Sequence, residues 1–583
     1  MSETATNRRV VLVGLDGMET ALMDEVIARG EAPTFKRLRE TGAWVGLDSG
    51  PDHDTGLSWE VAWSGRTCAT NNRLSAVEFD PSTYGVLQQG ATQIPFWQDI
   101  ASPGTTIVFD APYTSTVEAD DVVMVTAWGA HDPGYPRASW PTGLLSEIDS
   151  RFGPHPACNN DYTIVWNDVE RTKRMSQAFV DGAAKRVDVV EWLLARYPDW
   201  TLLVTVMSEP HGASEGFWHG MDSAHPLAGH PSAAHARDAL YAMVRAQDAA
   251  VDRLLAATPD AIHVVVSTGG MGTNASDVAS MVLLPELLYR NESGKKRLRW
   301  RRRLKPANAL VAGQRWPAEI EDRHRHSALR VGFRTHFPAT GRLISPILRK
   351  VRRVSQDDPA ADGPKPELVA WGLFDAGIQV EDRRTPSEIG THRTSISWHP
   401  ATKYCDAWPN MTAFALPSFY DGRIRINLVG RERDGIVSLD CYADTCAKIE
   451  RLLGECTDGA GQPFAASVER RSGDPMTRHD SDCDLLILWE KPVDTIIHPR
   501  LGRIGPVPFR RPGGHNGSKG FAVFDGSLSD VVGEVGTIRP LSDLAASMKT
   551  LLGQTLTAEE QRASFVRIEK TGPTVISGVA PLR

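Results

Sequence analysis

The sequence lacks several features that would assign the protein to a class at once. Its seven cysteines are odd in number and include no C-x-x-C pair, which argues against a disulfide framework and against a structural zinc knuckle. Its apolar runs, of which "LLVTVM" is typical, are too short to cross a bilayer. The formal net charge of -8 gives no global attraction to nucleic acid or to an anionic membrane. We therefore expect a reducing compartment and no membrane or nucleic-acid partner.

The N-terminal stretch also lacks the features of an export signal. "MSETATNRRVVLVGLDG" has no long apolar core and no small-residue cleavage site, because its apolar run stops at Asp16. This predicts an unexported, cytoplasmic protein.

One segment departs from the balanced charge of the rest. "KKRLRWRRRLK", Lys295 to Lys305, carries eight basic residues in eleven and opens a Pro- and Arg-rich run that ends at about residue 364. An anion, membrane-surface or nucleic-acid patch is one interpretation, but we favour a solvated face of a surface insertion. Limited proteolysis should therefore cut first within residues 291–364. Protection of this stretch, with cleavage in residues 1–250 instead, would refute that layout.

Strand-like and helix-like segments alternate through the first half of the chain. The apolar runs "RRVVLVGL" and "WTLLVTVMS" indicate buried strands, and "RMSQAFVDGAAKRVDVVEWLLARYP" indicates a long amphipathic helix. This alternation predicts an α/β protein with a mostly parallel sheet, whose ligands bind beyond the carboxyl ends of the strands. The polar or small residues expected at those ends are Asp16, Glu209, His211, Glu215, Thr268 and Gly269.

Four stretches follow one another in a characteristic order. They are "VVLVGLDGMETALMDEVIARGEAPTFKRLRETGAW", "DTGLSWEVAWSG", "AWPNMTAFALPSFYDGRIRINLVGRERDGIV" and "GGHNGSKGFAVFDG". Together they resemble the alkaline phosphatase superfamily, in its type I phosphodiesterase and nucleotide pyrophosphatase branch. The resemblance implies a three-layer alkaline-phosphatase-like core formed by residues 1–289 and completed by 490–583. Residues 290–489 would form an inserted cap region.

The resemblance also implies a metal centre and a covalent nucleophile. The aspartate of the G-x-D-G motif ligates metal in the family and is Asp16 here, and the late G-x-H histidine is His515. Thr55 falls at the nucleophile position of the second stretch. Family members typically hold two metal ions that clamp an in-line displacement. Weaker candidates for substrate binding, for which turn or loop roles are the alternative, are Asn71, Asn72 and His392.

A first departure from the family's pattern exchanges two ligands. Where the family usually carries Asp-x-x-x-His, this chain carries His211 and Glu215. With His515 they give two imidazoles and one carboxylate, a set that suits zinc, iron or manganese. Outside the resemblance, such a pair after a strand would more often be an ordinary polar loop. Glu209 or His219 would replace them if the register were shifted by a turn.

A second departure removes ligands. The family's S-D-H-G-M appears here as "STGGMG", which leaves Thr268 and Gly269 in the ligand places and offers at most a neutral hydroxyl. We therefore expect one tightly bound divalent ion, zinc before iron or manganese, and no stable second site. In "PDHDTG", His53 or Asp54 could supply the lost ligands or could be exposed turn residues, and both interpretations stay open.

Three functions compete on these residues. The main hypothesis is a metal-dependent phosphodiesterase or nucleotide pyrophosphatase that acts on a small phosphoester, nucleotide or phosphonate through a covalent Thr55 intermediate. One alternative is a single-metal, non-hydrolytic biosynthetic enzyme, such as a transferase, lyase or cyclase. The other is a non-catalytic binding protein. The ligand loss in "STGGMG" weakens the first hypothesis, and the coherent remaining ligand set weakens the last.

Overall fold

The structure is a computed structural model in which described residues are separated by gaps. The described ranges are 8–49, 56–100, 104–129, 137–157, 168–300, 320–322, 393–396, 399–465, 467–515, 517–525, 532–533 and 537–567. Within these ranges no helix combines the length and the apolar character that a membrane crossing requires. The candidates Thr55, His53, Asp54 and His392, with most of the basic stretch 291–364, lie outside the described residues.

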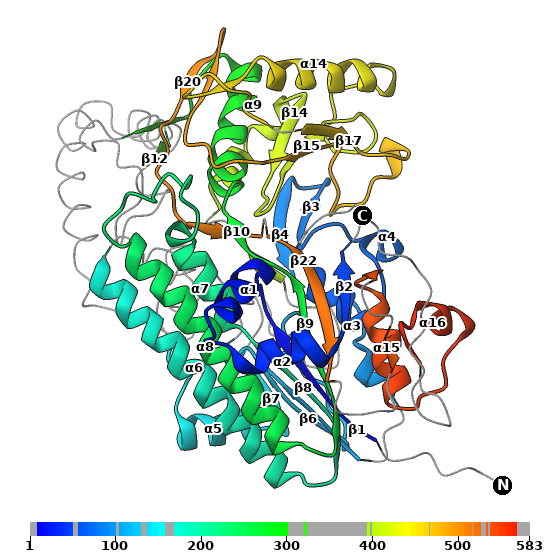
Figure 1. The fold of residues 1–583 in the computed structure, drawn as a ribbon. Helices are drawn as coiled ribbons and strands as arrows, with labels where there is room; N and C mark the ends of the chain where they lie inside the picture. The colour runs from blue at the N-terminus through cyan, green and yellow to red at the C-terminus, as the bar shows by residue number, and fades with distance from the viewer. Residues whose placement is uncertain are drawn as a thin grey trace, which may run out of the picture.

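A nine-stranded sheet lies in the lower part of the molecule as drawn in Figure 1, with the strand order β24-β2-β22-β9-β1-β8-β5-β6-β7. Strands β7 and β22 run antiparallel to their neighbours, and the other seven share one direction. The mostly parallel α/β sheet expected from the sequence is therefore confirmed. The bounds are β1 Arg9–Leu15, β2 Ala43–Asp48, β5 Thr105–Phe109, β6 Val122–Thr126, β7 Ala138–Trp140, β8 Trp200–Met207, β9 Ala261–Gly269, β22 Lys519–Phe524 and β24 Ile538–Pro540.

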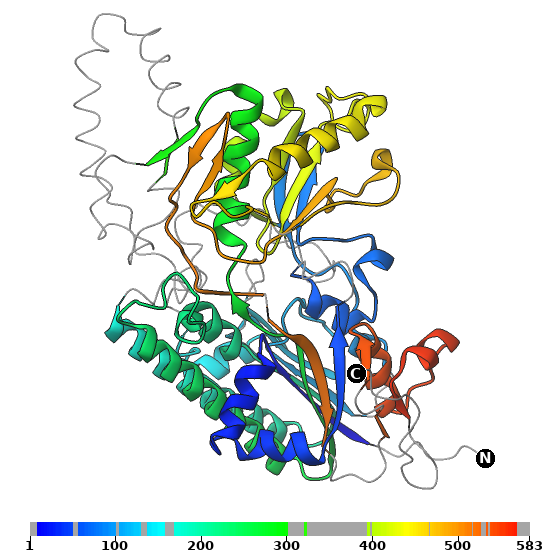
Figure 2. The ribbon, with the colours of Figure 1, turned by 45° about the horizontal axis from the view of Figure 1, so that its top comes forward.

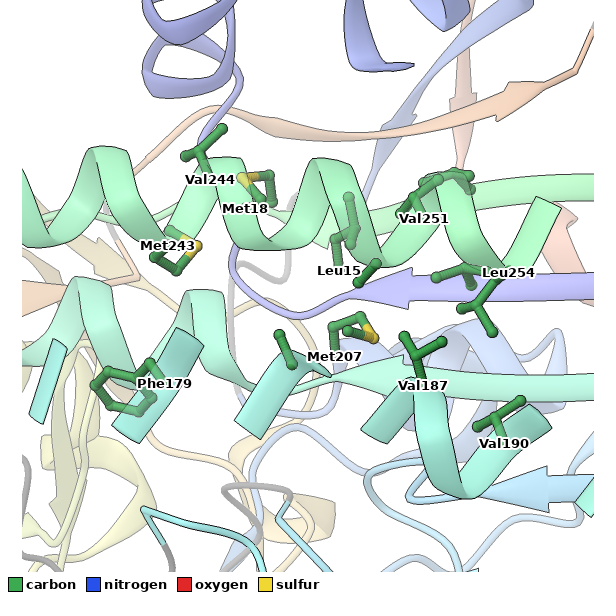
Figure 3. Packing of buried hydrophobic residues seen from close by; sticks show 14 of the residues in the cluster. Leu15, Met18, Phe179, Val187, Val190, Met207, Met243, Val244, Val251 and Leu254 are labelled. Atoms are coloured by element: carbon green, nitrogen blue, oxygen red, sulfur yellow. The ribbon is translucent and has the colours of Figure 1, made fainter. Parts of the chain in front are cut away.

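Helices cover both faces of this sheet and so complete three layers. Alternate residues of β1 enter opposite cores, with Val11 and Val13 in one cluster and Val10 and Leu12 in the other. Because both faces are covered, the strands are apolar throughout, as their sequences indicated. Figure 3 shows Leu15 in the first of these cores, beside α6 and α8. The first face carries α1 (Thr20–Ala28), α2 (Pro33–Thr41), α6 (Val169–Arg196) and α8 (Ala233–Ala257), and the second carries α3 (Ser58–Ser64) and α15 (Asp543–Leu551).

A separate hydrophobic core forms a cap next to the nine-stranded sheet (Figures 1 and 2). Its sheet has the order β14-β15-β18-β17, and Phe79 and Tyr84 join its core from the first part of the chain. The expected domain boundaries at 289/290 and 489/490 stay a prediction. The cap elements are β14 (Ala413–Leu416), β15 (Gly422–Ile426), β17 (Ser467–Arg470), β18 (Leu485–Leu488), α9 (Leu284–Ser293) and α14 (Tyr442–Gly454), and the hairpin beside them is β3 (Val77–Asp80) with β4 (Gly85–Gln89).

The "RINLVGRE" stretch, Arg425 to Glu432, contributes to the interior of the cap. Arg425 Nε donates to Glu432 Oε1 at 2.8 Å, and Arg431 Nη2 donates to Asp484 Oδ2 at 2.8 Å. The side chains of all four residues are buried. Because each charge has an opposite charge in contact, no charge of these four residues is buried without a partner.

Candidate active site

Asp16 and His211 lie at the carboxyl ends of two neighbouring strands. Asp16 directly follows β1, and its backbone N–H donates to the carbonyl of Met207, the last residue of β8, at 3.0 Å. Helix α7, Glu209–Phe217, begins two residues after β8 and carries His211 and Glu215 one turn apart. The parallel pairing of β1 with β8 therefore brings the two predicted ligand segments together.

The side chains of these residues form a row of polar contacts. His211 Nδ1 lies 2.9 Å from Asp16 Oδ2, and His211 Nε2 lies 3.5 Å from Glu215 Oε1. Trp59 Nε1, from α3, donates to Asp16 Oδ1 at 2.8 Å. The exposed fractions are 5% for Asp16 and His211 and 0% for Glu215. Two carboxylates and an imidazole are thus held out of water at the edge of the sheet.

The charges of these neighbouring side chains shift the pKa values of His211 and Asp16. Burial alone would lower the pKa of His211, but the charges of Asp16 and Glu215 outweigh burial and raise it to about 10. Burial likewise opposes ionisation of Asp16, yet His211 and the Trp59 N–H hold the pKa of Asp16 below its usual value. The His211 imidazole therefore lies between two carboxylates.

His515 reaches the same place from the C-terminal part of the chain. Its ring meets the ring of His211 edge-on, with centroids 4.8 Å apart and an interplanar angle of 87°. The ring of Tyr420 lies on His515 as well, at 4.7 Å. All four residues expected from the sequence as metal ligands, Asp16, His211, Glu215 and His515, are therefore neighbours in the fold.

Two glycines before His515 allow this approach. Gly513–Gly514 forms strand β21, which pairs with β10, Gly272–Thr273. A Cβ on Gly513 would lie 2.0 Å from the carbonyl oxygen of Ser214 in α7. No side chain fits in that space, so glycine is required for the strand to pack against the helix that carries Glu215.

Sequence reasoning missed a buried arginine beside Glu215. Arg511 donates through Nη1 to Glu215 Oε1, through Nε to Asp277 Oδ2 at 2.8 Å and through Nη2 to Asp277 Oδ1 at 2.5 Å. Burial opposes the charge of the guanidinium, but the two carboxylates raise the pKa of Arg511 well above its ordinary value. The sequence shows only a basic pair, in "RRPGGH", just before the late histidine motif, and this pair does not distinguish a buried arginine from an exposed one.

The end of β9 offers little to a metal ion. Thr268 Oγ1 makes a long contact of 3.4 Å with Ser58 Oγ, and Gly269 contributes a carbonyl that accepts from Ser267 Oγ at 3.0 Å. The segment thus brings no carboxylate or imidazole to the site from β9 itself, as its sequence indicates.

The alternative ligands of α7 and the segment after it have other partners. Glu209 Oε1 lies 2.9 Å from His155 Nε2 and 3.1 Å from Arg186 Nη2. His219 Nε2 lies 2.9 Å from Ser232 Oγ. The structure therefore places His211 and Glu215 near Asp16, while Glu209 and His219 contact other residues.

The asparagine candidates terminate a short helix. Asn71 is the last residue of α4, Cys68–Asn71, and Asn72 follows it with φ at 50°, in the left-handed region. Its backbone N–H donates to the carbonyl of Ala69 at 3.2 Å. Asparagine tolerates this conformation at helix ends, which supports the turn role.

The residue types at this site are ones that bind divalent ions, but in their present arrangement they do not form a metal site. Within the part of the chain that the structure describes, no group of three or more His, Cys, Asp or Glu side chains is arranged to hold a metal ion. Both ring nitrogens of His211 lie beside carboxylates, so the imidazole itself stands between the groups that an ion would contact. Histidine binds a metal ion only through a nitrogen that carries no proton. The two carboxylates and two imidazoles suit zinc, iron or manganese.

A histidine cluster lies next to the segment that carries Arg511. His225 Nε2 donates to the carbonyl of Pro512 at 3.2 Å, and its Nδ1 accepts from the N–H of Leu227 at 2.9 Å. Burial, with the charge of neighbouring histidines, lowers the pKa of His219 to about 3. Burial also lowers the pKa of His225 to about 4, against the opposing effects of the Pro512 carbonyl and Asp222.

These histidines should make the fold sensitive to acid. The unfolded chain takes up protons below the ordinary histidine pKa of 6.5, whereas folded His219 and His225 stay neutral down to about 3 and 4. Stability should therefore fall as the pH drops below 6.5, by about 2 kcal/mol per histidine by pH 5. Urea unfolding of wild type and His219→Gln at pH 7.5 and 5 measures this. Glutamine can keep the bond to Ser232, so the variant should lose less in acid; equal losses would refute the assignment.

Several solved structures align with this chain over most of its length. No protein-family model matches it, and no curated protein matches its sequence. It is similar to phosphonoacetate hydrolase from Sinorhizobium meliloti 1021 in complex with phosphonoacetate, with 12% identity over 92% of this chain and 94% of that chain and a TM-score of 0.40.

Two further solved structures have similar scores. Murine ectonucleotide pyrophosphatase/phosphodiesterase 5 is 10% identical over 96% of this chain and 100% of that chain, with a TM-score of 0.42. Wild-type alkaline phosphatase PafA is 10% identical over 95% and 97%, with a TM-score of 0.44.

Proposed function

We propose that the protein is a metal-dependent enzyme that acts on a small phosphoester, nucleotide or phosphonate. The observation that carries this proposal is the convergence of Asp16, His211, Glu215 and His515 from three distant segments at the carboxyl ends of β1 and β8. Burying charged side chains costs stability, and an apolar cluster would fill this space at lower cost. A binding or catalytic role explains why they are there.

The chain's own residues would prepare the site for the ion and the substrate. Asp16 is oriented by Trp59, and Glu215 is oriented by Arg511, so both carboxylates have fixed positions. When bound, the ion would offset the charge of phosphoryl oxygens and lower the pKa of an attacking hydroxyl. His211 and His515 would complete its ligands.

The neighbour of Thr55 supports this residue as the proposed nucleophile. Gly56 has φ at 74°, and a Cβ on it would lie 2.7 Å from Tyr420 Cε2. Tyr420 in turn contacts the ring of His515. The chain just after Thr55 therefore lies beside the candidate ligands.

Turnover assays test the proposal. Aryl phosphodiesters, nucleotides and phosphonates would be offered to the protein with zinc, manganese or iron, and we expect Thr55→Ala and Glu215→Ala to abolish turnover. Thr83→Ala, in the exposed turn before β4, is the matched control and should retain it. Turnover that survives Thr55→Ala would contradict the covalent mechanism, and an absence of turnover would favour a binding protein.

A non-hydrolytic enzyme with one ion is the second candidate. The observation that favours it is the end of β9, where Thr268 and Gly269 offer neither carboxylate nor imidazole. Product analysis distinguishes the two: hydrolysis adds water across the cleaved bond, whereas transfer or elimination leaves no oxygen from ¹⁸O-labelled water in the product.

A further inference from the structure

Arg511 lies as a buried cation between two carboxylates. Its exposed fraction is 7%, and those of Glu215 and Asp277 are 0% and 2%. One side of the guanidinium bonds Glu215, and the other side bonds both oxygens of Asp277. Arg510 adds a weaker contact, with Nη1 3.9 Å from Asp277 Oδ2. Glu215 is thus shared between Arg511 and the candidate metal ligand His211.

The side chain of Asn274 links the two backbone segments that carry Asp277 and Arg511. Asn274 Oδ1 accepts from the N–H of Asp277 at 3.0 Å, and Asn274 Nδ2 donates to the carbonyl of Gly513 at 3.0 Å. One side chain therefore holds the segment of Asp277 and the segment of Arg511 against each other. The backbone on both sides of the ion pair between Arg511 and Asp277 is thereby held in place.

The charges of the cluster match a single divalent ion. Asp16, Glu215 and Asp277 supply three negative charges, and Arg511 supplies one positive charge. With the histidines left out of the count and Arg510 set aside at 3.9 Å from Asp277, two negative charges remain, and one divalent ion would neutralise them. A second ion would leave an excess of buried positive charge, which is costly in a medium of low dielectric constant.

We propose that Arg511 is a built-in counter-cation, which fills the place of a second ion between Glu215 and Asp277 and so limits the site to one exchangeable divalent ion. This inference rests on the proposed metal-dependent function. It gives Arg511 a positioning role toward Glu215, because a guanidinium that bonds one carboxylate oxygen leaves the carboxylate oriented for its other neighbour.

Removing the charge of Arg511 should open a second cation site. In Arg511→Met, Glu215 and Asp277 would face each other without a cation, and they should take up a second divalent ion, giving about two per chain against about one in wild type. Arg511→Lys keeps the charge and should stay at about one. Adding Asp277→Asn to Arg511→Met should also restore about one, because one carboxylate is neutralised. Elemental analysis after loading with Mn²⁺ gives these counts.

Thermal unfolding supplies a readout that does not depend on activity. The ion-free Arg511→Met variant should unfold at a lower temperature than wild type, and Mn²⁺ should raise its midpoint by more than it raises that of wild type. One ion per chain in Arg511→Met, with no extra gain in stability from Mn²⁺, would overturn the inference while leaving the proposed function intact. A wild type without any ion would refute the proposed metal dependence and, with it, the inference that rests on it.

A second variant covers the case in which Arg511→Met does not fold. In Asp277→Asn the guanidinium would bond Glu215 more strongly and draw it away from the ion, so Mn²⁺ affinity should fall by about 10-fold or more. Unchanged affinity in Asp277→Asn would also overturn the inference.

Discussion

Glu215→Ala should strip the divalent ion from the protein. Glu215 is fully buried, lies one turn from His211 and shares its carboxylate between His211 and Arg511. Its removal deletes a charged ligand, so the affinity for the ion should fall by more than the roughly 10- to 100-fold that changes in a supporting residue cost. Isothermal titration of the ion-free protein with Zn²⁺ measures the change.

Two further variants make this result specific. Glu215→Gln keeps the size of the side chain and should also lose the ion, which excludes a collapsed cavity as the cause. His219→Gln lies in the neighbouring segment, where His219 bonds Ser232 instead, and should keep the ion. Full ion content in Glu215→Ala would show that "PHGASEGFWHG" is only a loop.

Arg186→Met should destabilise the fold by about 3–5 kcal/mol, because it leaves two carboxylates buried without their cation. Arg186 Nη1 donates to Asp110 Oδ2 at 2.7 Å, and Nη2 donates to Glu209 Oε1 at 3.1 Å. The exposed fractions of the three side chains are at most 1%. Although burial opposes it, the charge of Arg186 lowers the pKa of Glu209 to about 2. Urea unfolding followed by circular dichroism measures the loss.

Arg253→Met is the matched control for Arg186→Met. Arg253, in α8, forms ion pairs of 2.9 Å and 2.8 Å with Asp188 and Glu191 of α6, but its side chain is 41% exposed. Exposed pairs contribute about 0–1 kcal/mol, so the control should unfold almost as wild type does. Equal losses in the two variants would contradict the assignment of the Arg186 cluster as a buried ion network.

The arrangement of the core could be predicted because its pattern is local. The apolar run of β1 ends at Asp16, and a strand that ends in a polar residue indicates the carboxyl edge of a parallel sheet. The four-residue spacing of His211 and Glu215 becomes one turn of α7, which puts both side chains on one face. Local spacing thus predicts that His211 and Glu215 share one face of an element, whereas their candidacy as metal ligands comes from the family resemblance.

The rest of the site depends on contacts between distant residues, which no spacing encodes. Arg511 and Glu215 are 296 positions apart, and Trp59 bonds Asp16 across 43. An arginine that will be buried has the same sequence appearance as one on a solvated face, so "RRPGGH" gave no sign of the ion pair with Asp277. For the same reason the charges of "INLVGRE" could not be assigned to the cap interior before the structure placed Asp484 beside Arg431.

The number of divalent ions in the purified protein tests the central claim most directly. Elemental analysis of wild type and His53→Ala should give about one tightly bound ion per chain in both, because the donors near His211 form one set and the end of β9 adds no carboxylate or imidazole. The His53→Ala variant tests whether His53, which lies outside the described residues, supplies a ligand for a second ion. About two ions in wild type, falling in His53→Ala, would contradict the single-ion account.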